Sequence, residues 1–219
     1  MAPARTGRPR AAGPSPTGQG TRADVLTAAA ALFCTRGYTS SSTHAIAEAA
    51  GIRQASMYHH FERKHDILLA LLLDTVQPSL EVAARLLAEG DDPAARLWAL
   101  CVADVRLLSA GPHNVGALYL LPEVSEDAFR PFRERRSELE TTYKTLVAAS
   151  GLPADRVDVT TSLVLGLVES VILQRKRGVV ITDRTAEAIA SAALRVLDLD
   201  AAVISRAVDL GKGVLDRIA

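Results

Sequence analysis

The side chains best suited to binding an anion gather in one segment of the N-terminal third, where hydroxyl, amide, imidazole and cationic groups follow closely. Within it, the run Ile46–Ile52 (IAEAAGI) places a small residue, Ala47, four positions before Gly51. A helix-turn-helix needs a small residue where its two helices cross and a residue that tolerates positive φ in the turn. Apolar Ile52 and Met57 would then hold the second helix against the first. The spacing predicts a helix-turn-helix, although an alanine-rich chain offers many such matches by chance.

The residues around this run indicate which surface would meet the anion. Over residues 54–64, donors and acceptors fall on one face of a short helix, while Met57 and Phe61 fall four apart on the inner face. Ser42 or Thr43 can cap the preceding helix, which directs free backbone N–H groups and the helix dipole at a phosphate.

The distribution of charge favours nucleic acid as that anion. Residues 1–66 contain eight basic and four acidic residues, so the rest of this neutral chain carries 17 basic and 21 acidic residues. A basic front on an acidic body suggests contact with DNA or RNA. The alternative is that both kinds of charge are ordinary solvated surface.

Other chemistries leave few marks in the chain. No GxSxG elbow, phosphate loop, HExxH pair or carboxylate pair identifies an enzyme, which makes enzymes the less favoured class. His59 and His60 diverge by about 100° on a helix, and His65 follows at an unsuitable spacing, so no metal is expected. Cys34 and Cys101 are expected to be small buried thiols in a reducing cytoplasm. We expect no cofactor.

The composition favours helices as the elements that position these groups. Of 219 residues, 48% are hydrophobic but only 4% aromatic, which disfavours a β-sandwich. Apolar residues at three- and four-residue spacing, punctuated by glycine and proline, predict an all-α fold. The expected helices cover 22–36, 44–50, 54–61, 63–77, 79–89, 93–109, 114–121, 126–150, 155–177, 183–198 and 200–217, with a break at Pro78.

Two stretches of the chain bear on targeting. Residues 1–20 are rich in proline, glycine and arginine, lack any apolar signal region, and are expected to form a disordered basic tail. Its run Gly7–Arg10 could enter a DNA minor groove or could merely aid solubility. The apolar stretch 157–173 is interrupted by Asp158 and Glu169, so no membrane span is expected.

From about residue 19 to residue 79, the sequence resembles the tetracycline-repressor-like (TetR/AcrR) family of bacterial transcriptional regulators. The matching residues are Leu32-Phe33, Gly37-Tyr38, Thr43, Ile46–Ile52, Ser56–Phe61, Lys64 and Leu68. The resemblance implies a three-helix DNA-binding domain over residues 21–66 and a helical ligand-binding and dimerisation domain over residues 67–219. It also implies a recognition helix over residues 54–60 that enters the major groove.

The resemblance assigns roles to single residues of the DNA-binding domain. Those implied to bind phosphates are Thr43, Tyr58 and Lys64, those implied to face base edges are Gln54, Ala55, Ser56 and His59, and Arg53 and His60 complete the predicted DNA-binding set. Ala55 and Met57 stand where the family commonly has Gly and Leu, changes that the fold tolerates. Arg53 stands where the family often has Ser or Thr, which exchanges a helix cap for a possible phosphate contact.

The body of the chain carries signals of dimerisation. Segment 155–177 is apolar all round, so it must be buried on both sides, one against its own core and one against a partner. With segment 183–198 it would build a four-helix interface between two copies, the arrangement that the resemblance also implies. The predicted interface residues are Leu163, Leu167, Val171, Ile172, Ile189 and Ala193.

A ligand pocket is less visible in the body. Its candidate lining residues, each of which could equally fill the core, are Trp98, Cys101, Val105, Tyr119, Phe129 and Tyr143. Asp104, Arg106 and Glu169 could orient a polar ligand or lie on the surface. The sequence predicts a homodimeric, non-enzymatic repressor that a small, mainly apolar molecule releases from an inverted-repeat operator in double-stranded DNA. The alternative is the same kind of regulator under the control of a protein partner or of no ligand.

Overall fold

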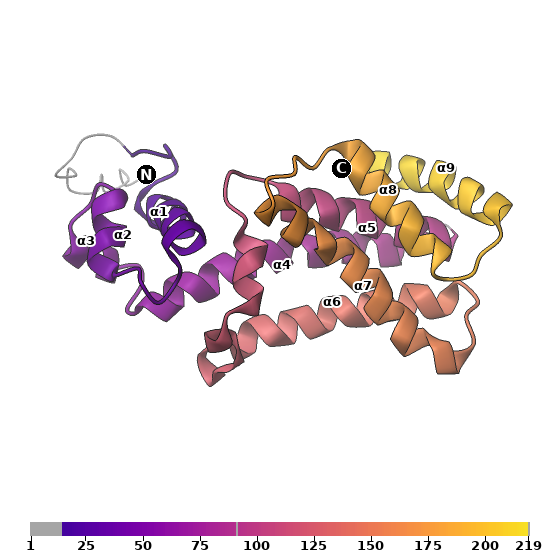
Figure 1. Cartoon of the computed structure of the whole chain (residues 1–219), viewed down its shortest axis with the longest axis horizontal. Helices are drawn as coiled ribbons and strands as arrows, with labels where there is room; N and C mark the ends of the chain where they lie inside the picture. Colours follow the sequence, from indigo (N-terminus) through magenta and orange to yellow (C-terminus); the bar gives the residue numbers. More distant parts are fainter. Residues whose placement is uncertain (1–14, 91, 219) are drawn as a thin grey trace, which may run out of the picture. The chain divides into compact units, whose positions relative to one another are not determined.

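The chain is helical throughout the part that the structure describes. The computed structural model describes residues 15–90 and 92–218, and within these ranges it contains helices, turns and no strand (Figure 1). The chain divides into two compact units, Met1–Leu71 and Leu72–Ala219. The prediction of an all-α fold is confirmed.

The first unit is a small helical domain around a closely packed apolar core. It contains α1 (Thr21–Arg36), α2 (Thr43–Ala49), α3 (Gln54–Tyr58) and the beginning of α4 (Lys64–Ala88). Its most deeply buried apolar side chains are Val25, Phe33, Ile46, Met57, Ile67 and Leu68. Because α3 has only five residues, it depends on Met57, which is fully buried, to hold it against the rest of the unit.

The segment before α1 is more ordered than the sequence indicated. Residues 15–20 were expected to belong to a disordered tail, but Asp24, which is 2% exposed, binds them to α1. Its carboxylate accepts hydrogen bonds from Ser15 Oγ at 2.8 Å, Thr17 N at 2.9 Å and Thr17 Oγ1 at 2.6 Å. A charge-assisted network of this kind can order a segment that has no apolar side chain to bury. The expected minor-groove run Gly7–Arg10 lies outside the described residues.

Helix α4 passes through Pro78, so the predicted break at this residue is wrong. A proline within a helix removes one backbone hydrogen bond and favours a kink or a break. Here, Val76, Leu80 and Ala83 on either side of the proline are buried at helical spacing. Burial of this apolar face favours the continuous helix over the local preference of proline.

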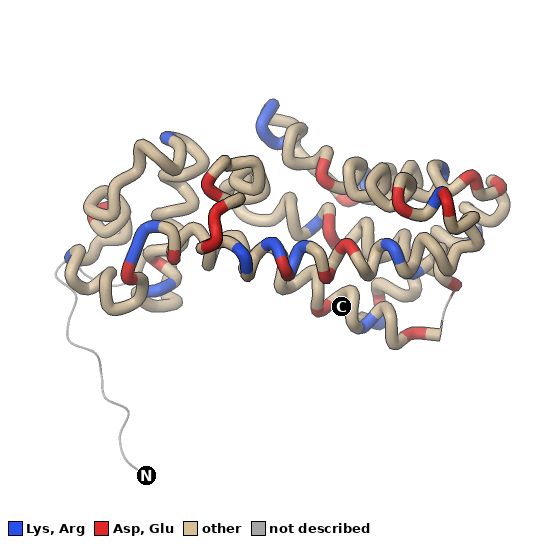
Figure 2. The backbone as a smooth tube through the Cα atoms, turned by 90° about the horizontal axis from the view of Figure 1, so that it is seen from below, with Lys and Arg blue, Asp and Glu red and all other residues tan. Residues whose placement is uncertain are grey.

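The second unit surrounds one central helix, α5 (Pro93–Ser109), which packs against the four long helices that follow it in the chain. These are α6 (Arg130–Ala149), α7 (Ala154–Lys176), α8 (Asp183–Arg195) and α9 (Ala201–Ile218). Three short 3-10 helices, η1 (Val115–Leu120), η2 (Pro122–Ser125) and η3 (Asp127–Phe129), connect α5 to α6. Acidic and basic residues are interspersed along these helices (Figure 2).

The centre of this unit is the contact between α5 and α9. Trp98 of α5 is 1% exposed, and its indole Nε1 donates a hydrogen bond of 3.2 Å to Ser191 Oγ of α8. Its ring lies against Gly211 of α9, where an added Cβ would come within 2.6 Å of the tryptophan Cε3. The glycine therefore allows the two helices to approach at this point.

Two helices of the described chain, α4 and α7, are long and apolar enough to cross a membrane by length and composition alone. Each also contributes buried side chains to the protein, such as Leu72 of α4 and Val164 of α7. Core helices of soluble proteins meet the same criterion, so this is weak support for a membrane span.

Candidate nucleic-acid interface

The turn between α2 and α3 has the geometry that the sequence predicted. Gly51 has φ of +66°, a conformation that favours glycine, and its N–H donates to Glu48 O at 3.0 Å. Ala47 is 2% exposed, as expected of a residue where two helices cross. Ser42 caps α2 by accepting a hydrogen bond of 3.1 Å from Ala45 N. These contacts fix the direction in which α3 leaves the turn.

A network of three polar side chains ties the start of α2 to α3. The Gln54 amide Nε2 donates to Thr43 Oγ1 at 2.9 Å and to Tyr58 OH at 3.2 Å, and the two hydroxyl oxygens lie 3.3 Å apart. Tyr58 is 45% exposed, so the network is open to solvent. The resemblance assigned each of these residues a separate DNA contact. The structure brings them together, which the sequence did not indicate.

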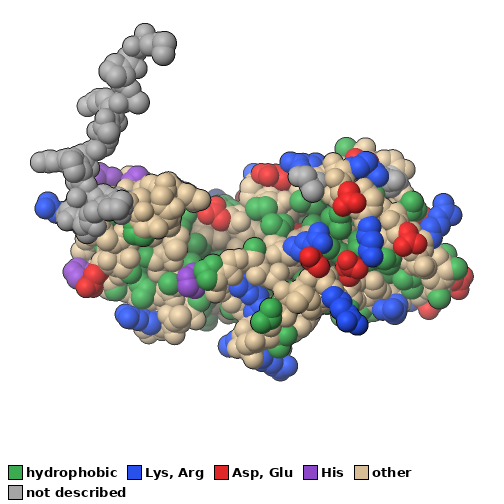
Figure 3. All heavy atoms as spheres, turned by 90° about the horizontal axis from the view of Figure 1, so that it is seen from above, with side chains coloured by type: hydrophobic (Ala, Val, Ile, Leu, Met, Phe, Trp, Pro, Cys, Tyr) green, Lys and Arg blue, Asp and Glu red, His purple; other side chains and the backbone are tan. Residues whose placement is uncertain are grey.

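The remaining predicted DNA-contacting residues of this region leave most of α3 accessible. The exposed ones are Arg53, Ala55, His59 and His60, and Ser56 is half-buried. Arg53 makes no side-chain cap to α3, consistent with the expected loss of a cap at this position. Figure 3 shows histidine side chains on the surface of this unit. Within the described ranges, no three histidine, cysteine, aspartate or glutamate side chains are grouped as a metal site would require.

Lys64 makes its described contacts with the protein itself. Its Nζ donates hydrogen bonds to the carbonyl oxygens of Tyr38 at 2.9 Å, Ser41 at 3.1 Å and Thr39 at 3.4 Å. The ammonium also lies 4.2 Å from the centre of the Tyr38 ring, within the range of a cation–π interaction. Lys64 therefore fixes the turn between α1 and α2. Its predicted contact with phosphate stays a prediction.

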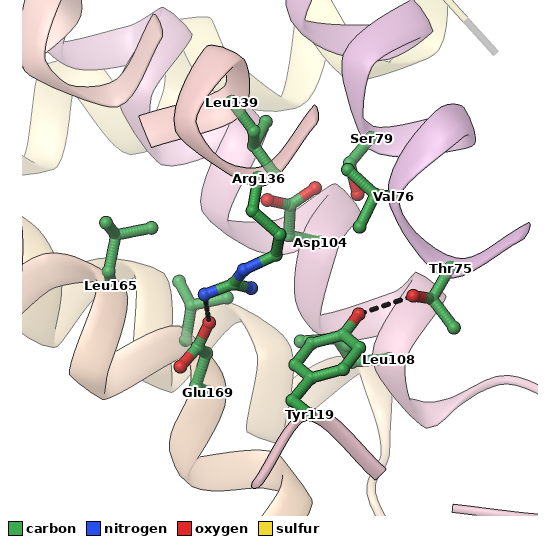
Figure 4. Close-up of a pocket in the computed structure, with 11 residues that line it drawn as sticks. Thr75, Val76, Ser79, Asp104, Leu108, Tyr119, Arg136, Leu139, Leu165 and Glu169 are labelled. Atoms are coloured by element: carbon green, nitrogen blue, oxygen red, sulfur yellow. Dashed lines mark hydrogen bonds and ion pairs between the residues drawn. The ribbon is translucent and has the colours of Figure 1, made fainter. Parts of the chain in front are cut away.

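The second unit contains a small polar cavity bordered by α4, α5, η1, α6 and α7 (Figure 4). Its volume is about 20 Å³, which is room for roughly one water molecule. The lining residues are Thr75, Val76, Ser79, Asp104, Leu108, Tyr119, Arg136, Leu139, Leu165, Val168 and Glu169. This is far below the roughly 300 Å³ of a typical ligand pocket.

Of the residues predicted to bind a ligand, only Tyr119 lines this cavity. The other five, which are 0–1% exposed, fill the core: Trp98, Cys101, Val105, Phe129 and Tyr143. Of the three charged residues considered, Asp104 and Glu169 line the cavity, whereas Arg106 is exposed and pairs with Asp183 at 2.8 Å. Thr75, Ser79 and Arg136 were not predicted. Their types are common on helix surfaces, so only their position in the folded chain distinguishes them.

Polar contacts within the cavity join four elements. Tyr119 OH of η1 and Thr75 Oγ1 of α4 share a hydrogen bond of 2.5 Å. The Arg136 guanidinium of α6 lies 2.5 Å from a carboxylate oxygen of Glu169 on α7, and 4.9 Å from the centre of the Tyr119 ring. Figure 4 shows both contacts beside the Asp104 carboxylate.

Asp104 is the most deeply buried acid of the cavity, at 3% exposure. Its Oδ2 accepts a hydrogen bond of 2.7 Å from Tyr143 OH, whereas its Oδ1 has no hydrogen-bond partner among the described residues. Burial raises the pKa of Asp104 to about 6, although Tyr143, the nearby Ser79 hydroxyl and Arg136 each lower it. Burial likewise raises the pKa of Tyr143 well above its usual value.

The six predicted interface residues divide into two groups. Leu163 is 52% exposed, and Leu167 and Ile172 are half-buried. Val171, Ile189 and Ala193 are at most 9% exposed, because they pack into the core of their own protomer. Exposed apolar residues of α7 that were not predicted, Val159 and Leu173, extend the exposed face on which Leu163 lies. This face of α7 is therefore the part of the expected interface that the protomer leaves uncovered.

Comparisons with known proteins agree with this geometry. Residues 25–71 match the family model of bacterial regulatory proteins, tetR family. The crystal structure of Mycobacterium smegmatis AmtR is 46% identical, covers 92% of this chain and 98% of that chain, and superposes with a TM-score of 0.80. The HTH-type transcriptional repressor KstR2 of Rhodococcus jostii is 32% identical over 127 residues, which are 58% of this chain and 61% of that protein, less than two thirds of its length.

A more distant structure shares the fold. AibR, solved in complex with isovaleryl coenzyme A and operator DNA, is 21% identical, with a TM-score of 0.67 over 79% of this chain and 97% of that chain. The family-model match covers the helix-turn-helix region, and the likeness to AmtR extends over nearly the whole chain. The chain therefore belongs to the TetR family of bacterial regulatory proteins.

Proposed function

We propose that this protein is a cytoplasmic transcriptional repressor that binds an inverted-repeat operator in double-stranded DNA. The observation that carries the proposal is the exposed Thr43–Gln54–Tyr58 network at the start of α2 and along α3. It fixes two hydroxyls and an amide on an accessible surface, and such groups contact phosphates and base edges. KstR2, which shares 32% identity over the aligned region, is a repressor, and this supports the sign of regulation.

The proposal requires two copies of the chain. One recognition helix of five residues reads few base pairs, so a specific site needs two helices about 34–36 Å apart. We propose that the exposed face of α7, formed by Val159, Leu163 and Leu173, supplies the dimer interface. Burying these side chains between copies would remove apolar surface from water.

A selection of bound fragments from random or genomic DNA tests the function directly. We expect recovery of a sequence with two-fold symmetry, bound without added cofactor. The measured affinity should fall steeply with salt, because lysine and arginine contacts to phosphates release counterions. Recovery of no enriched sequence at low salt would overturn the proposal.

Control by an effector is the finer part of the proposal. We propose that a small molecule bound in the second unit shifts α4, the helix that also begins in the first unit, and thereby lowers operator affinity. A hundredfold loss needs a coupling of about 2.7 kcal/mol. The small size of the cavity favours the second candidate, in which a protein partner or no ligand controls the regulator.

Titration of operator binding with cell extract separates these candidates. Release by the low-molecular-mass fraction of the extract supports a small effector. Release by the protein fraction alone supports a protein partner. Equal operator affinity with every fraction supports a repressor that needs no ligand.

A further inference from the structure

The second unit buries an acid with an unmet hydrogen-bonding requirement. Asp104 is 3% exposed and lines the cavity, and its Oδ1 has no partner among the described residues. A buried carboxylate oxygen without a donor is costly, so native structures nearly always satisfy such atoms. The cavity beside it has room for a donor the size of one water molecule.

The charges around the cavity favour a cationic donor. Two carboxyl groups, those of Asp104 and Glu169, line it together with one guanidinium, that of Arg136. Arg136 is already engaged with Glu169, and it also lies over the Tyr119 ring. When both acids are ionised, one negative charge therefore remains uncompensated where the surroundings screen it poorly.

The rest of the lining suits a small amine. Hydroxyl oxygens of Thr75, Ser79 and Tyr119 can accept hydrogen bonds from the remaining N–H groups of an ammonium head. The apolar part of the lining, which could contact a short alkyl chain, consists of Val76, Leu108, Leu139, Leu165 and Val168. An ammonium head is close to water in size, whereas a guanidinium or a quaternary ammonium is much larger.

We propose that this cavity binds the primary ammonium group of a small alkylamine, with Asp104 as its main anionic partner. The inference rests on the proposed function, because it names the chemical class of the effector in the second unit. The amine supplies the donor that Asp104 Oδ1 lacks. Its binding also compensates the excess negative charge of the cavity.

Calorimetric titration of the full-length protein with methylammonium and propylammonium chloride at pH 8 tests the proposal. Potassium chloride at equal ionic strength, tetramethylammonium chloride and 1-propanol control for salt, for a cation without N–H donors and for the alkyl chain. We expect heat of binding from the two primary amines alone. Binding of potassium, tetramethylammonium or 1-propanol with equal affinity would overturn the assignment.

Matched variants locate the site. Asp104→Asn keeps the shape of the side chain and removes its charge, and we expect affinity for propylammonium to fall at least tenfold. Asp183→Asn makes the same change at an exposed acid outside the cavity and should leave affinity unchanged. Should Asp104→Asn not fold, Glu169→Gln removes the second acid and should also weaken binding. Unchanged affinity in the folded cavity variant refutes the site.

Operator binding by the same preparations separates this inference from the proposed function. Operator binding by a protein that binds no amine overturns the inference and leaves the repressor intact. Amine binding that leaves operator affinity unchanged supports the site and overturns its role as an effector site.

Discussion

The two units of the molecule place their polar side chains in opposite ways. In the first unit, Thr43, Gln54 and Tyr58 bond to one another at the surface, over a core that is apolar. In the second unit, Asp104 and Tyr143 bond to each other inside the core. A surface network can change without loss of the fold, whereas a buried one is part of the fold. Substitutions in the first unit should therefore alter DNA binding, and substitutions in the second unit should alter stability.

The largest expected effect is on assembly. Leu163→Glu places a charge on the exposed face of α7, where it costs little in the monomer but several kcal/mol in a closed apolar interface. We expect a folded monomer by sedimentation and a loss of operator affinity of at least a hundredfold. Arg184→Glu, an exposed change on α8, is the control. A dimeric Leu163→Glu variant with full operator affinity would contradict this assignment.

Substitution of the buried acid should change how stability depends on pH. The pKa of Asp104 is about 6 in the folded protein against 3.8 as its ordinary value, so the folded state binds the proton more tightly than the unfolded state. Stability attributable to this group is therefore present at low pH and lost as pH rises from about 4 to 6. Relative to Asp104→Asn, the wild type should lose about 3 kcal/mol between pH 4 and pH 7.

Urea unfolding of both proteins across this range measures the difference, which cancels the other carboxylates. The groups that face or influence the Asp104 carboxylate are Ser79 of α4, Cys101 of α5, Arg136 and Tyr143 of α6 and Glu169 of α7. Asp183→Asn, in an exposed pair, serves as control. Parallel pH profiles for wild type and Asp104→Asn would show that Asp104 does not titrate in this range.

Lys64→Ala tests a residue with two assigned roles. Loss of its hydrogen bonds to the turn between α1 and α2 should lower the free energy of unfolding by about 1–3 kcal/mol. Loss of a phosphate contact should weaken binding to all DNA sequences and reduce the salt slope by about one. Reduced stability with an unchanged salt slope would leave Lys64 with its structural role alone.

The smallest effect on stability is expected at the surface network. Gln54→Ala should change the free energy of unfolding by less than about 0.5 kcal/mol. Preference at particular base pairs should weaken by about 1–3 kcal/mol, measured by competition among single-site operator variants. A large loss of stability would place the network in the architecture of the unit, and the contrast between the two units would fail.

How far sequence reasoning reached differs between the units for the same reason. Local rules predicted α1, the turn at Gly51 and the burial of Met57, because spacing and backbone preference act over a few residues. They failed at Pro78, where burial of α4 outweighs the local preference of proline. They also missed Thr75, Ser79 and Arg136, which meet only when four elements pack together.

The contact between Trp98 and Gly211 has a consequence for the history of this protein. Any side chain at position 211 would collide with the indole, so the two positions cannot drift independently during evolution. Among descendants of a common ancestor, we expect tryptophan at 98 to coincide with glycine at 211, and a larger residue at 211 to follow a smaller one at 98. The order of substitution would then be constrained: the tryptophan must be lost before the glycine can be replaced.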